Sequence, residues 1–350
     1  MHRILVTAVG GNIGQGVVKA LRSGSRDYFI VGTDMEPRSA GFSFVDRACV
    51  TLAAGAAGMA AGLTAILEDE GIEAIYVCSP QELPFFSAAR GDLERATGAR
   101  VLVNPEPVIR VGQDKLATAL FLETHGFPYP ETALADDGPA VDGLIERWGF
   151  PVIAKPRGGW TSVNVFTIRS RAELDAVRVL VPDLVVQRYL PDAAAEYTAG
   201  VVGSAAAGRF AWIVLRRDLT QGTTYRTELV QDETLGATVT AMAQALGVEG
   251  ACNFQFRIAD GQPLVFEINP RFSGTSGIRY LYGFNDPEMA FEHACLDQPV
   301  VQPVLHPGLV MRYWNEVHVP AAGFQSIPGS LPAGEAVTLP PPRSLRAARS

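Results

Sequence analysis

The first 104 residues alternate strand-length apolar runs with helix-length amphipathic patterns, and this alternation limits the fold more than any other feature of the chain. The strand-like runs lie at 3–10, 28–34, 73–78 and 101–104, and the helix-like patterns lie at 17–24, 58–70 and 84–97. Strands that alternate with helices form parallel sheets covered by helices on both faces. The sequence therefore predicts an α/β fold that opens with a doubly wound parallel sheet.

Prolines mark the end of this region. In the segment Asn104-Pro105-Glu106-Pro107, the residue before each proline is disfavoured in the helical conformation, which indicates a boundary. Beyond it we expect a helical stretch at 107–125, a loop-like segment at 127–140 and a β-loop-β-α-β module ending at 190. Strand patterns dominate the rest, with helices predicted at 234–247 and 286–296. The expected parts are thus 1–104, 105–190, 191–320 and a Pro/Arg-rich tail at 321–350.

Composition excludes several classes of partner. The formal net charge is −8, so no basic face for nucleic acid is expected. There is no apolar stretch of about 20 residues that could span a membrane. The start of the sequence shows no cleavable apolar segment, and the four scattered cysteines have no paired spacing. We therefore expect a cytoplasmic protein whose partners are small molecules, and a homodimer stays open.

A single hairpin pattern carries the strongest chemical signal. In the segment 253–271, Glu267 and Asn269 lie two residues apart on one predicted strand, and Asp260-Gly261 forms a turn before it. Spacing by two places both side chains on one face of a sheet, and Gln255 has the parity to join them. Three oxygen donors suit Mg²⁺ held together with nucleotide phosphates, and Arg271 continues the alternation. A solvated polar strand end is the alternative.

Lysine is rare in this chain. Only Lys19, Lys115 and Lys155 occur, against 26 arginines. A lysine retained against this preference suggests a site that needs a compact ammonium group rather than a planar fork.

These motifs resemble the ATP-grasp superfamily, nearest to the carbamoyl phosphate synthase large subunits and small stand-alone carboxylate–amine ligases. The resemblance extends to about residue 315. It implies a pre-ATP-grasp doubly wound α/β domain, a small lid subdomain with a glycine-rich loop, and a C-terminal α+β subdomain with the metal ligands.

The resemblance also implies roles for single residues. Lys115 in Q-D-K-L and Lys155 in P-V-I-A-K-P match residues that contact ATP phosphates. Arg271 matches the arginine that steadies the transferred phosphoryl group and, with Lys155, is expected to be catalytic. The other matches are an adenine-binding hinge, a ribose-binding glutamate and ligands of Mg²⁺ or, alternatively, Mn²⁺: Gln187 and Leu190 for adenine, Glu196 for ribose, and Gln255, Glu267 and Asn269 for the metal.

Some positions depart from the family pattern. Gln187 replaces a frequent glutamate of the hinge, and Gln255 stands where the first metal ligand is often acidic. In the lid loop Trp160 replaces a second glycine pair, and Asn164 replaces a glycine. These changes affect the expected nucleotide affinity and lid closure more than ATP use itself.

Substrate residues are less constrained by the sequence. Arg279, past the glycines that end the metal strand, is the candidate to hold a substrate carboxylate, with a surface role as the alternative. Glu82 follows a strand at the edge where open α/β sheets bind ligands, and it is the candidate for a substrate amine, against a purely structural role. One of Arg216 and Arg217 is expected to contact ATP, and the sequence does not distinguish them.

The principal expectation is an ATP-dependent ligase that joins a carboxylate to an amine, or to ammonia, through an acyl phosphate, acting on amino-acid-like small molecules. Two alternatives remain. The turn G-G-N-I-G-Q-G at 10–16 with Asp34 outlines a dinucleotide fingerprint, which would suit an NAD(P)-dependent oxidoreductase or epimerase. That alternative lacks a Y-x-x-x-K pair, since neither Tyr189 nor Tyr280 precedes a lysine by four residues. A non-catalytic ATP-binding protein of the same fold is the second alternative.

Overall fold

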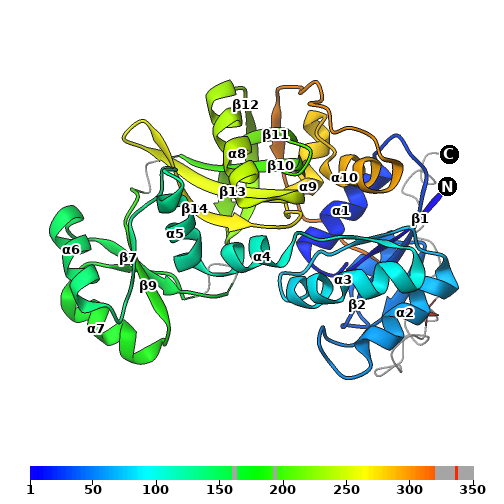
Figure 1. The fold of residues 1–350 in the computed structure, drawn as a ribbon, viewed down its shortest axis with the longest axis horizontal. Helices are drawn as coiled ribbons and strands as arrows, with labels where there is room; N and C mark the ends of the chain where they lie inside the picture. The colour runs from blue at the N-terminus through cyan, green and yellow to red at the C-terminus, as the bar shows by residue number, and fades with distance from the viewer. Residues whose placement is uncertain (160–163, 192–194, 320–335, 338–350) are drawn as a thin grey trace.

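The computed structural model describes residues 1–159, 164–191, 195–319 and 336–337 of the chain. Within these residues the strands form three sheets, which Figure 1 shows as an N-terminal sheet on the right, a lid sheet on the left and a central sheet between them. Trp160, where the lid loop departs from the family pattern, lies outside the described residues, as does nearly all of the predicted tail at 321–350. Among the described helices, none has the length and apolar character needed to cross a membrane.

The N-terminal sheet confirms the predicted parallel arrangement. Its order is β16-β3-β2-β1-β4-β5, in which β1 to β5 pair in parallel and β16 joins β3 antiparallel. The strands are β1 (His2–Val6), β2 (Tyr28–Asp34), β3 (Arg47–Val50), β4 (Ala74–Tyr76), β5 (Arg100–Leu102) and β16 (Ala336–Val337). Strand β3 was not predicted, and β1 ends four residues earlier than expected because the chain turns at Ala8, which has a φ of 48°.

Apolar side chains on alternate positions of these strands face two separate cores. Leu5, Val31 and Ile75 pack under α2 and α3, whereas Ile4 and Ile30 pack under α1 and α10. The helices of this region are α1 (Asn12–Arg22), η1 (Ala40–Phe44), α2 (Met59–Glu70) and α3 (Leu83–Thr97). The sheet is therefore covered on both faces, as a doubly wound fold requires.

The lid sheet is antiparallel and has its own small core. Its order is β6-β9-β7-β8, with α6 and α7 packed through residues such as Leu144 and Leu174. The elements are β6 (Thr132–Leu134), α6 (Gly138–Trp148), β7 (Val152–Pro156), β8 (Phe166–Ile168), α7 (Arg171–Leu180) and β9 (Leu184–Arg188). The predicted β-loop-β-α-β module is confirmed, whereas the segment expected to be loop-like contains β6 and the start of α6.

The single helical stretch expected at 107–125 is two helices, α4 (Glu106–Gln113) and α5 (Lys115–Thr124). Asp114 interrupts them in an extended conformation, and its carboxylate accepts hydrogen bonds from the backbone N–H groups of Leu116 and Ala117. An aspartate in this position caps the second helix and ends the first. The same carboxylate pairs with Arg157 of the lid, with an Nη2 to Oδ2 distance of 2.7 Å, so the helix start is tied to the lid strand.

The central sheet is antiparallel, with the order β14-β13-β10-β11-β12-β15. Its elements are β10 (Glu196–Ser204), β11 (Arg209–Thr220), β12 (Thr223–Val230), α8 (Glu233–Leu246), β13 (Glu249–Ala259), β14 (Gln262–Asn269), α9 (Ser276–Arg279), η2 (Tyr280–Tyr282), α10 (Asp286–Leu296) and β15 (Leu309–Met311). The predicted hairpin is confirmed, because Gln255 lies directly opposite Glu267. Helices α4, α5 and α8 cover one face, and α9 and α10 cover part of the other.

Two glycines let the N-terminal region approach the central sheet closely. A Cβ at Gly277 of α9 would lie 2.7 Å from the Cα atom of Gly16 in α1, which is too short for any larger residue. This contact brings the beginning of α1 against the loop after β14 (Figure 1). Gly16 and Gly277 therefore allow close helix packing between the two regions.

Candidate functional site

A cavity of about 910 Å³ lies where the three sheets meet. Its walls come from the lid strands, the exposed end of the central sheet and the loops after β1 and β4. Nine of the eleven residues selected from the sequence line it: Lys115, Lys155, Gln187, Leu190, Glu196, Gln255, Glu267, Asn269 and Arg271. The other two, Arg279 and Glu82, do not belong to the lining.

Positive charge dominates this cavity, although the chain as a whole is acidic. Among the described residues, the lining contains two carboxylates, Glu196 and Glu267, and seven cationic side chains: Lys115, Lys155, Arg188, Arg217, Arg257, Arg271 and Arg312. Such a concentration of cations in a partly enclosed space attracts anions. The cavity is therefore suited to a polyanionic ligand.

The two lysines approach the cavity from either side of the lid junction. Lys155 on β7 is buried, and its Nζ donates to the amide oxygen of Gln187 on β9 at 2.8 Å. Burial lowers the pKa of Lys155 to about 8, while Glu267 acts in the opposite direction. Lys115, at the start of α5, donates to the carbonyl oxygens of Gly158 and Gly159 in the lid loop. Burial also lowers the pKa of Lys115.

A row of paired charges crosses three neighbouring strands of the central sheet. Glu196 on β10 lies opposite both Arg217 on β11 and Arg257 on β13. The Arg217 Nη2 atom is 2.6 Å from Glu196 Oε1 and 2.6 Å from Gln255 Oε1. Arg217, and not Arg216, lines the cavity, because Arg216 points to Glu228 at the exposed surface. The structure thus distinguishes the two arginines that the sequence left equivalent.

Glu267, Asn269 and Arg271 form a chain of hydrogen bonds along the end of β14. The Asn269 Nδ2 group donates to Glu267 Oε1 at 3.0 Å, and Arg271 Nη2 donates to Asn269 Oδ1 at 2.8 Å. Burial lowers the pKa of Arg271, and the nearby Glu267 carboxylate acts against that shift. The alternation expected from the sequence therefore brings these three side chains together on one face.

The donor set limits which metal ion could bind here. The described residues contain no group of three or more His, Cys, Asp or Glu side chains that could hold a metal. Glu267 with Asn269 fits Mg²⁺, which needs only one or two protein carboxylates when phosphates and water complete its shell. Gln255 fits less well, because its side-chain oxygen already accepts from Arg217.

Arg279 requires a correction. Its side chain is only 1% exposed, and Nη1 pairs with Asp286 Oδ2 at 2.9 Å in the interior. Nη2 also donates to Asn253, and the guanidinium packs on Gly200, where a Cβ would lie 2.3 Å from the Arg279 Cζ atom. Because Asp286 and Asn253 hold its guanidinium, Arg279 supports the sheet beneath Asn269 and has no access to a substrate carboxylate. The Gly274 and Gly277 turn directs it inward, which sequence spacing alone does not reveal.

Glu82 lies behind the cavity wall. Its carboxylate accepts from the Thr7 hydroxyl at 2.5 Å, while the neighbouring residues Ser79, Pro80 and Gln81 line the cavity. Burial raises the pKa of Glu82 to about 7, only partly offset by the bond from Thr7. Contact between Glu82 and a substrate amine stays a prediction that no contact in this arrangement supports.

The glycine turn differs from a dinucleotide site at Asp34. Asp34, which would hold a ribose in such a site, accepts instead from the backbone N–H groups of Gly10 at 2.7 Å and Glu36 at 2.9 Å. Residue Gly41 packs so closely on the turn that a Cβ there would lie 1.9 Å from the Val9 carbonyl oxygen. The turn is therefore packed against the η1 segment, while Gly11 and Asn12 of the same turn line the cavity.

Sequence reasoning missed several lining residues. Asn12 comes from the start of α1, and Ser273 follows β14. Arg312 arrives from the far end of the chain, just after β15. Arg312 stands in no motif, so only the fold could reveal it. Asn12 lies within the glycine turn, and that turn was the one available signal.

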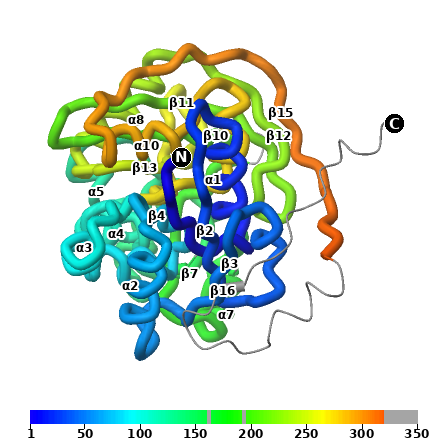
Figure 2. The backbone as a smooth tube through the Cα atoms, turned by 90° about the vertical axis from the view of Figure 1, so that its right-hand side faces the viewer, coloured from blue at the N-terminus to red at the C-terminus, as the bar shows by residue number. Residues whose placement is uncertain are grey.

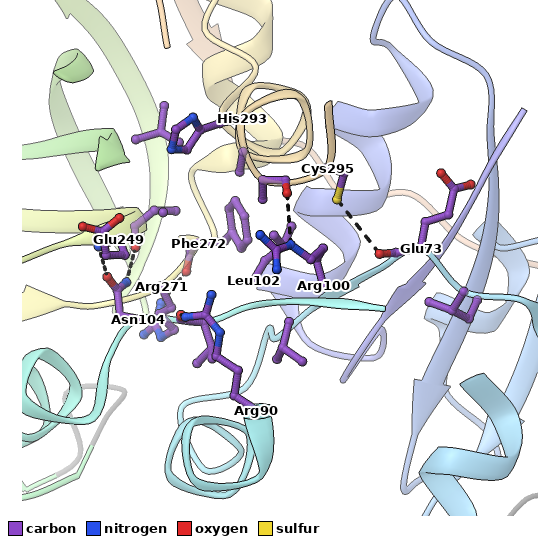
Figure 3. A pocket seen from close by; sticks show the side chains of 18 of the residues that line it. Glu73, Arg90, Arg100, Leu102, Asn104, Glu249, Arg271, Phe272, His293 and Cys295 are labelled. Carbon is purple, nitrogen blue, oxygen red and sulfur yellow. Dashed lines mark hydrogen bonds between the residues drawn. The ribbon is translucent and has the colours of Figure 1, made fainter. Parts of the chain in front are cut away.

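A second cavity, also about 910 Å³, lies between the N-terminal and central sheets, as Figure 3 shows. Its polar groups are bonded to one another across the two regions. Asn104 donates to the carbonyl oxygens of Ala251 and Pro270 and accepts from the Glu249 N–H, and Arg100 donates to the Ala294 carbonyl. Arg271 reaches both cavities. These bonds join the N-terminal region to the central sheet, and the second cavity is called the seam cavity below.

Comparison with known proteins agrees with this architecture. The family model described as ATP-grasp in the biosynthetic pathway with Ter operon matches residues 180–317. A D-alanine–D-alanine ligase of Chromohalobacter salexigens is 24% identical over 240 residues, which are 67% of this chain and 61% of that protein. A second such ligase, from Ralstonia pickettii, is 25% identical over 203 residues, or 51% of this chain and 59% of that protein. The chain therefore spans about 60% of the length of these curated relatives.

Among solved structures, N5-carboxyaminoimidazole ribonucleotide synthetase from Thermus thermophilus has a TM-score of 0.69 at 18% identity. The match covers 99% of this chain and 95% of that one. This likeness shows that the fold is shared over nearly the whole chain. The chain thus has the fold of these proteins, and the match to the ATP-grasp family model covers the strands that carry Glu196 and Glu267.

Proposed function

We propose that this protein is an ATP-dependent ligase that activates a carboxylate as an acyl phosphate and transfers the acyl group to an amine. The observation that carries the proposal is the meeting of Lys115 and Lys155 with Glu267, Asn269 and Arg271 in one cationic cavity. Relatives that are D-alanine–D-alanine ligases support the same reaction class. The joining of amino-acid-like molecules is the activity this combination favours.

ATP would enter between the lid sheet and the central sheet. The hinge residues Gln187 and Leu190 line the cavity and would contact the adenine. Glu196, which is held by Arg217 and Arg257, would contact the ribose. Lys155 and Lys115 would then hold the phosphates, since both ammonium groups face the cavity without a carboxylate partner among the described residues. A bound polyphosphate would favour the charged form of Lys155 and raise its pKa.

The chemistry needs neutralisation of charge more than covalent participation by the protein. A carboxylate oxygen of the substrate attacks the terminal phosphorus of ATP, and the bond to ADP breaks. Arg271 and the two lysines stabilise the charge on the transferred group. Mg²⁺, held by Glu267 and Asn269, would supply further neutralisation of the phosphate oxygens.

An amine then attacks the acyl carbon, phosphate leaves, and the nitrogen gives up a proton. Water would destroy the acyl phosphate, so the lid must exclude it during this step. Lys115 bonds to the lid-loop carbonyls, and Arg157 bonds to Asp114, so the α5 terminus and the lid are already coupled. Ammonia as the nitrogen source stays open, and a substrate amine is the simpler arrangement.

Nucleotide preference and ADP release test the proposal. Mg-ATP should raise the melting temperature because it binds the native state, and NAD(P)H should not. The same protein, incubated with Mg-ATP and pooled amino acids and small carboxylates, should release ADP above the rate without them. Stabilisation by nicotinamide nucleotides alone would overturn the ligase assignment. ATP binding with no ADP release from any pool would instead favour the non-catalytic alternative.

A further inference from the structure

Arg312 is a cation in the cavity that the reaction scheme above does not use. It directly follows the edge strand β15, in the segment that Figure 2 shows beside β12. Its backbone N–H donates to the Tyr225 carbonyl, and its side chain lines the same cavity as Glu267 and Arg271. The fold therefore brings an arginine from the segment after β15 into the cavity.

The hydrogen bonds of Arg312 fix its position without neutralising its charge. Nη1 donates to the Thr224 carbonyl oxygen at 3.1 Å, and Nη2 donates to the Gly274 carbonyl oxygen. These bonds use two of the five N–H donors of a guanidinium, which leaves three. Across the described part of the chain, Arg312 has no carboxylate partner, and burial lowers its pKa with no opposing carboxylate.

Three other arginines of this region differ in that respect. Arg217 and Arg257 share Glu196, and Arg279 pairs with Asp286 in the interior. Burying a cation without a counter-ion costs free energy, and a ligand anion would remove that cost. Arg312 is therefore arranged to receive an anion from outside the protein.

The surroundings of Arg312 indicate a small organic acid rather than a polyphosphate. Its bond partner Gly274 also lies against the Asn12 side chain, since a Cβ on Gly274 would be 2.8 Å from Asn12 Nδ2. The Asn12 side chain makes no hydrogen bond to another described residue, and it also lines the cavity. One guanidinium fork and one neutral amide suit a carboxylate, which accepts two parallel hydrogen bonds from arginine.

The division of roles within the cavity selects the substrate. Gly274 is three residues beyond Arg271, so extended chain places them roughly 10 Å apart at most, and an anion on Arg312 lies near the reacting centre. Arg271 and Glu267 already serve the phosphorylated carboxylate in the proposed reaction, so we assign the anion on Arg312 to the other substrate. It suits the carboxylate of the amine substrate, whose amino group would then face the acyl phosphate.

We propose that Arg312, assisted by Asn12, binds the carboxylate of the amine substrate, which makes that substrate an amino acid. This assignment rests on the proposed ligase function and names the class of its second substrate. It also places the carboxylate-binding role at a residue that the hairpin motif does not contain.

The test is ligand binding to protein loaded with Mg²⁺ and a non-hydrolysable ATP analogue. Each common amino acid is compared with the amide of the same amino acid by thermal shift and then by titration calorimetry. We expect at least one free amino acid to bind and its amide to bind about 10- to 100-fold more weakly, as the loss of a charge-assisted pair predicts. Arg312→Gln should lose the same factor, and Arg312→Lys should recover little because it lacks the fork.

Arg226→Gln is the matched control, since Arg226 lies on the neighbouring strand β12 with an exposed side chain. It should bind the amino acid as the wild type does. A normal melting-temperature increase with the ATP analogue will show that Arg312→Gln is folded. Failure of the analogue to stabilise the wild type would count against the proposed function itself.

With that stabilisation present, three outcomes overturn the assignment of Arg312. They are the absence of binding by every amino acid, equal binding of acid and amide, and unchanged binding by Arg312→Gln.

Discussion

The two cavities have the same volume and share Arg271, yet they differ in how their charges are satisfied. In the seam cavity of Figure 3, Asn104, Arg100 and Glu249 are bonded across the boundary between two regions. In the other cavity, Lys155 and Arg312 donate to amide or carbonyl oxygens that leave their positive charges unneutralised. Volume therefore does not distinguish a binding site from a structural gap, whereas positive charge without an ion-pair partner among the described residues does.

This difference has an energetic meaning. A buried cation without an anion lowers the stability of the empty protein, and a bound anion restores it. A polar group that is fully bonded within the protein contributes stability without any ligand. Substitutions in the first cavity should therefore affect turnover, and substitutions in the seam should affect unfolding.

The largest difference should come from paired glutamate substitutions. Glu267→Gln retains shape but removes the one carboxylate that joins Asn269 in the first cavity. We expect ADP release to fall by about 1000-fold or more, or about 4 kcal/mol in the activation barrier, because the lost charge acts mainly in the transition state. Glu249→Gln in the seam should stay within about twofold, since its carboxylate caps the Ala206 N–H and an amide oxygen can replace it.

Steady-state ADP release by the folded variants measures this comparison. Equal losses in the two variants would remove the distinction between the cavities. A Glu267→Gln enzyme within about twofold of the wild type would contradict the assigned role of that strand.

Arg279 belongs to neither cavity, so its removal should affect folding and not substrate affinity. Arg279→Ala leaves Asp286 buried without its partner, and breaking such a pair costs about 3 kcal/mol or more. Urea unfolding should show this loss, and Asp286→Asn added to Arg279→Ala should recover part of it. Unchanged stability with a higher KM for one organic substrate would restore the substrate-binding role first expected for Arg279.

Glu82 provides a pH-dependent test beside the first cavity. Burial raises its pKa to about 7 from an ordinary value of 4.5, so the folded protein keeps a proton that the unfolded chain releases at lower pH. The contribution of Glu82 to stability is favourable below pH 4.5 and is lost as pH rises to about 7. Glu82→Gln removes this loss and should be more stable than the wild type by up to about 3 kcal/mol at about pH 8.

Near pH 4.5 the two proteins should differ little, because Glu82 is protonated in the folded wild type as well. Thermal unfolding at both pH values provides the measurement. A Glu82→Gln protein that is less stable at the higher pH would show that the charged carboxylate is favoured in the fold.

The features that could be predicted from the sequence are those that depend on residues close together along the chain. Alternation places Glu267 and Asn269 on one strand face, and the rarity of lysine together with the family resemblance singled out Lys115 and Lys155. Asp114 carried a cap signal for α5, but the apolar pattern on both sides of it favoured one helix. Arg279 and Arg312 could not be assigned locally, because a turn buries one and an edge strand delivers the other.

The smallest effect is expected at the seam. Asn104 is 2% exposed, and its side chain donates to the Ala251 and Pro270 carbonyls at 2.8 and 3.0 Å while it accepts from the Glu249 N–H at 2.8 Å. Asn104→Ala leaves these three buried groups without partners, which should cost about 2 kcal/mol in the free energy of unfolding. ATP affinity should remain within about twofold, because no nucleotide-binding side chain is changed.

Asn315→Ala serves as the control, since Asn315 is exposed and, among the described residues, its side chain bonds only to the adjacent Glu316 N–H. Pro270 directly precedes Arg271, so the seam holds the strand end from which Arg271 enters the first cavity. A slower turnover of Asn104→Ala with unchanged ATP affinity would therefore mean that the seam positions Arg271. A large loss of ATP affinity with normal stability would instead show that the two cavities form one site.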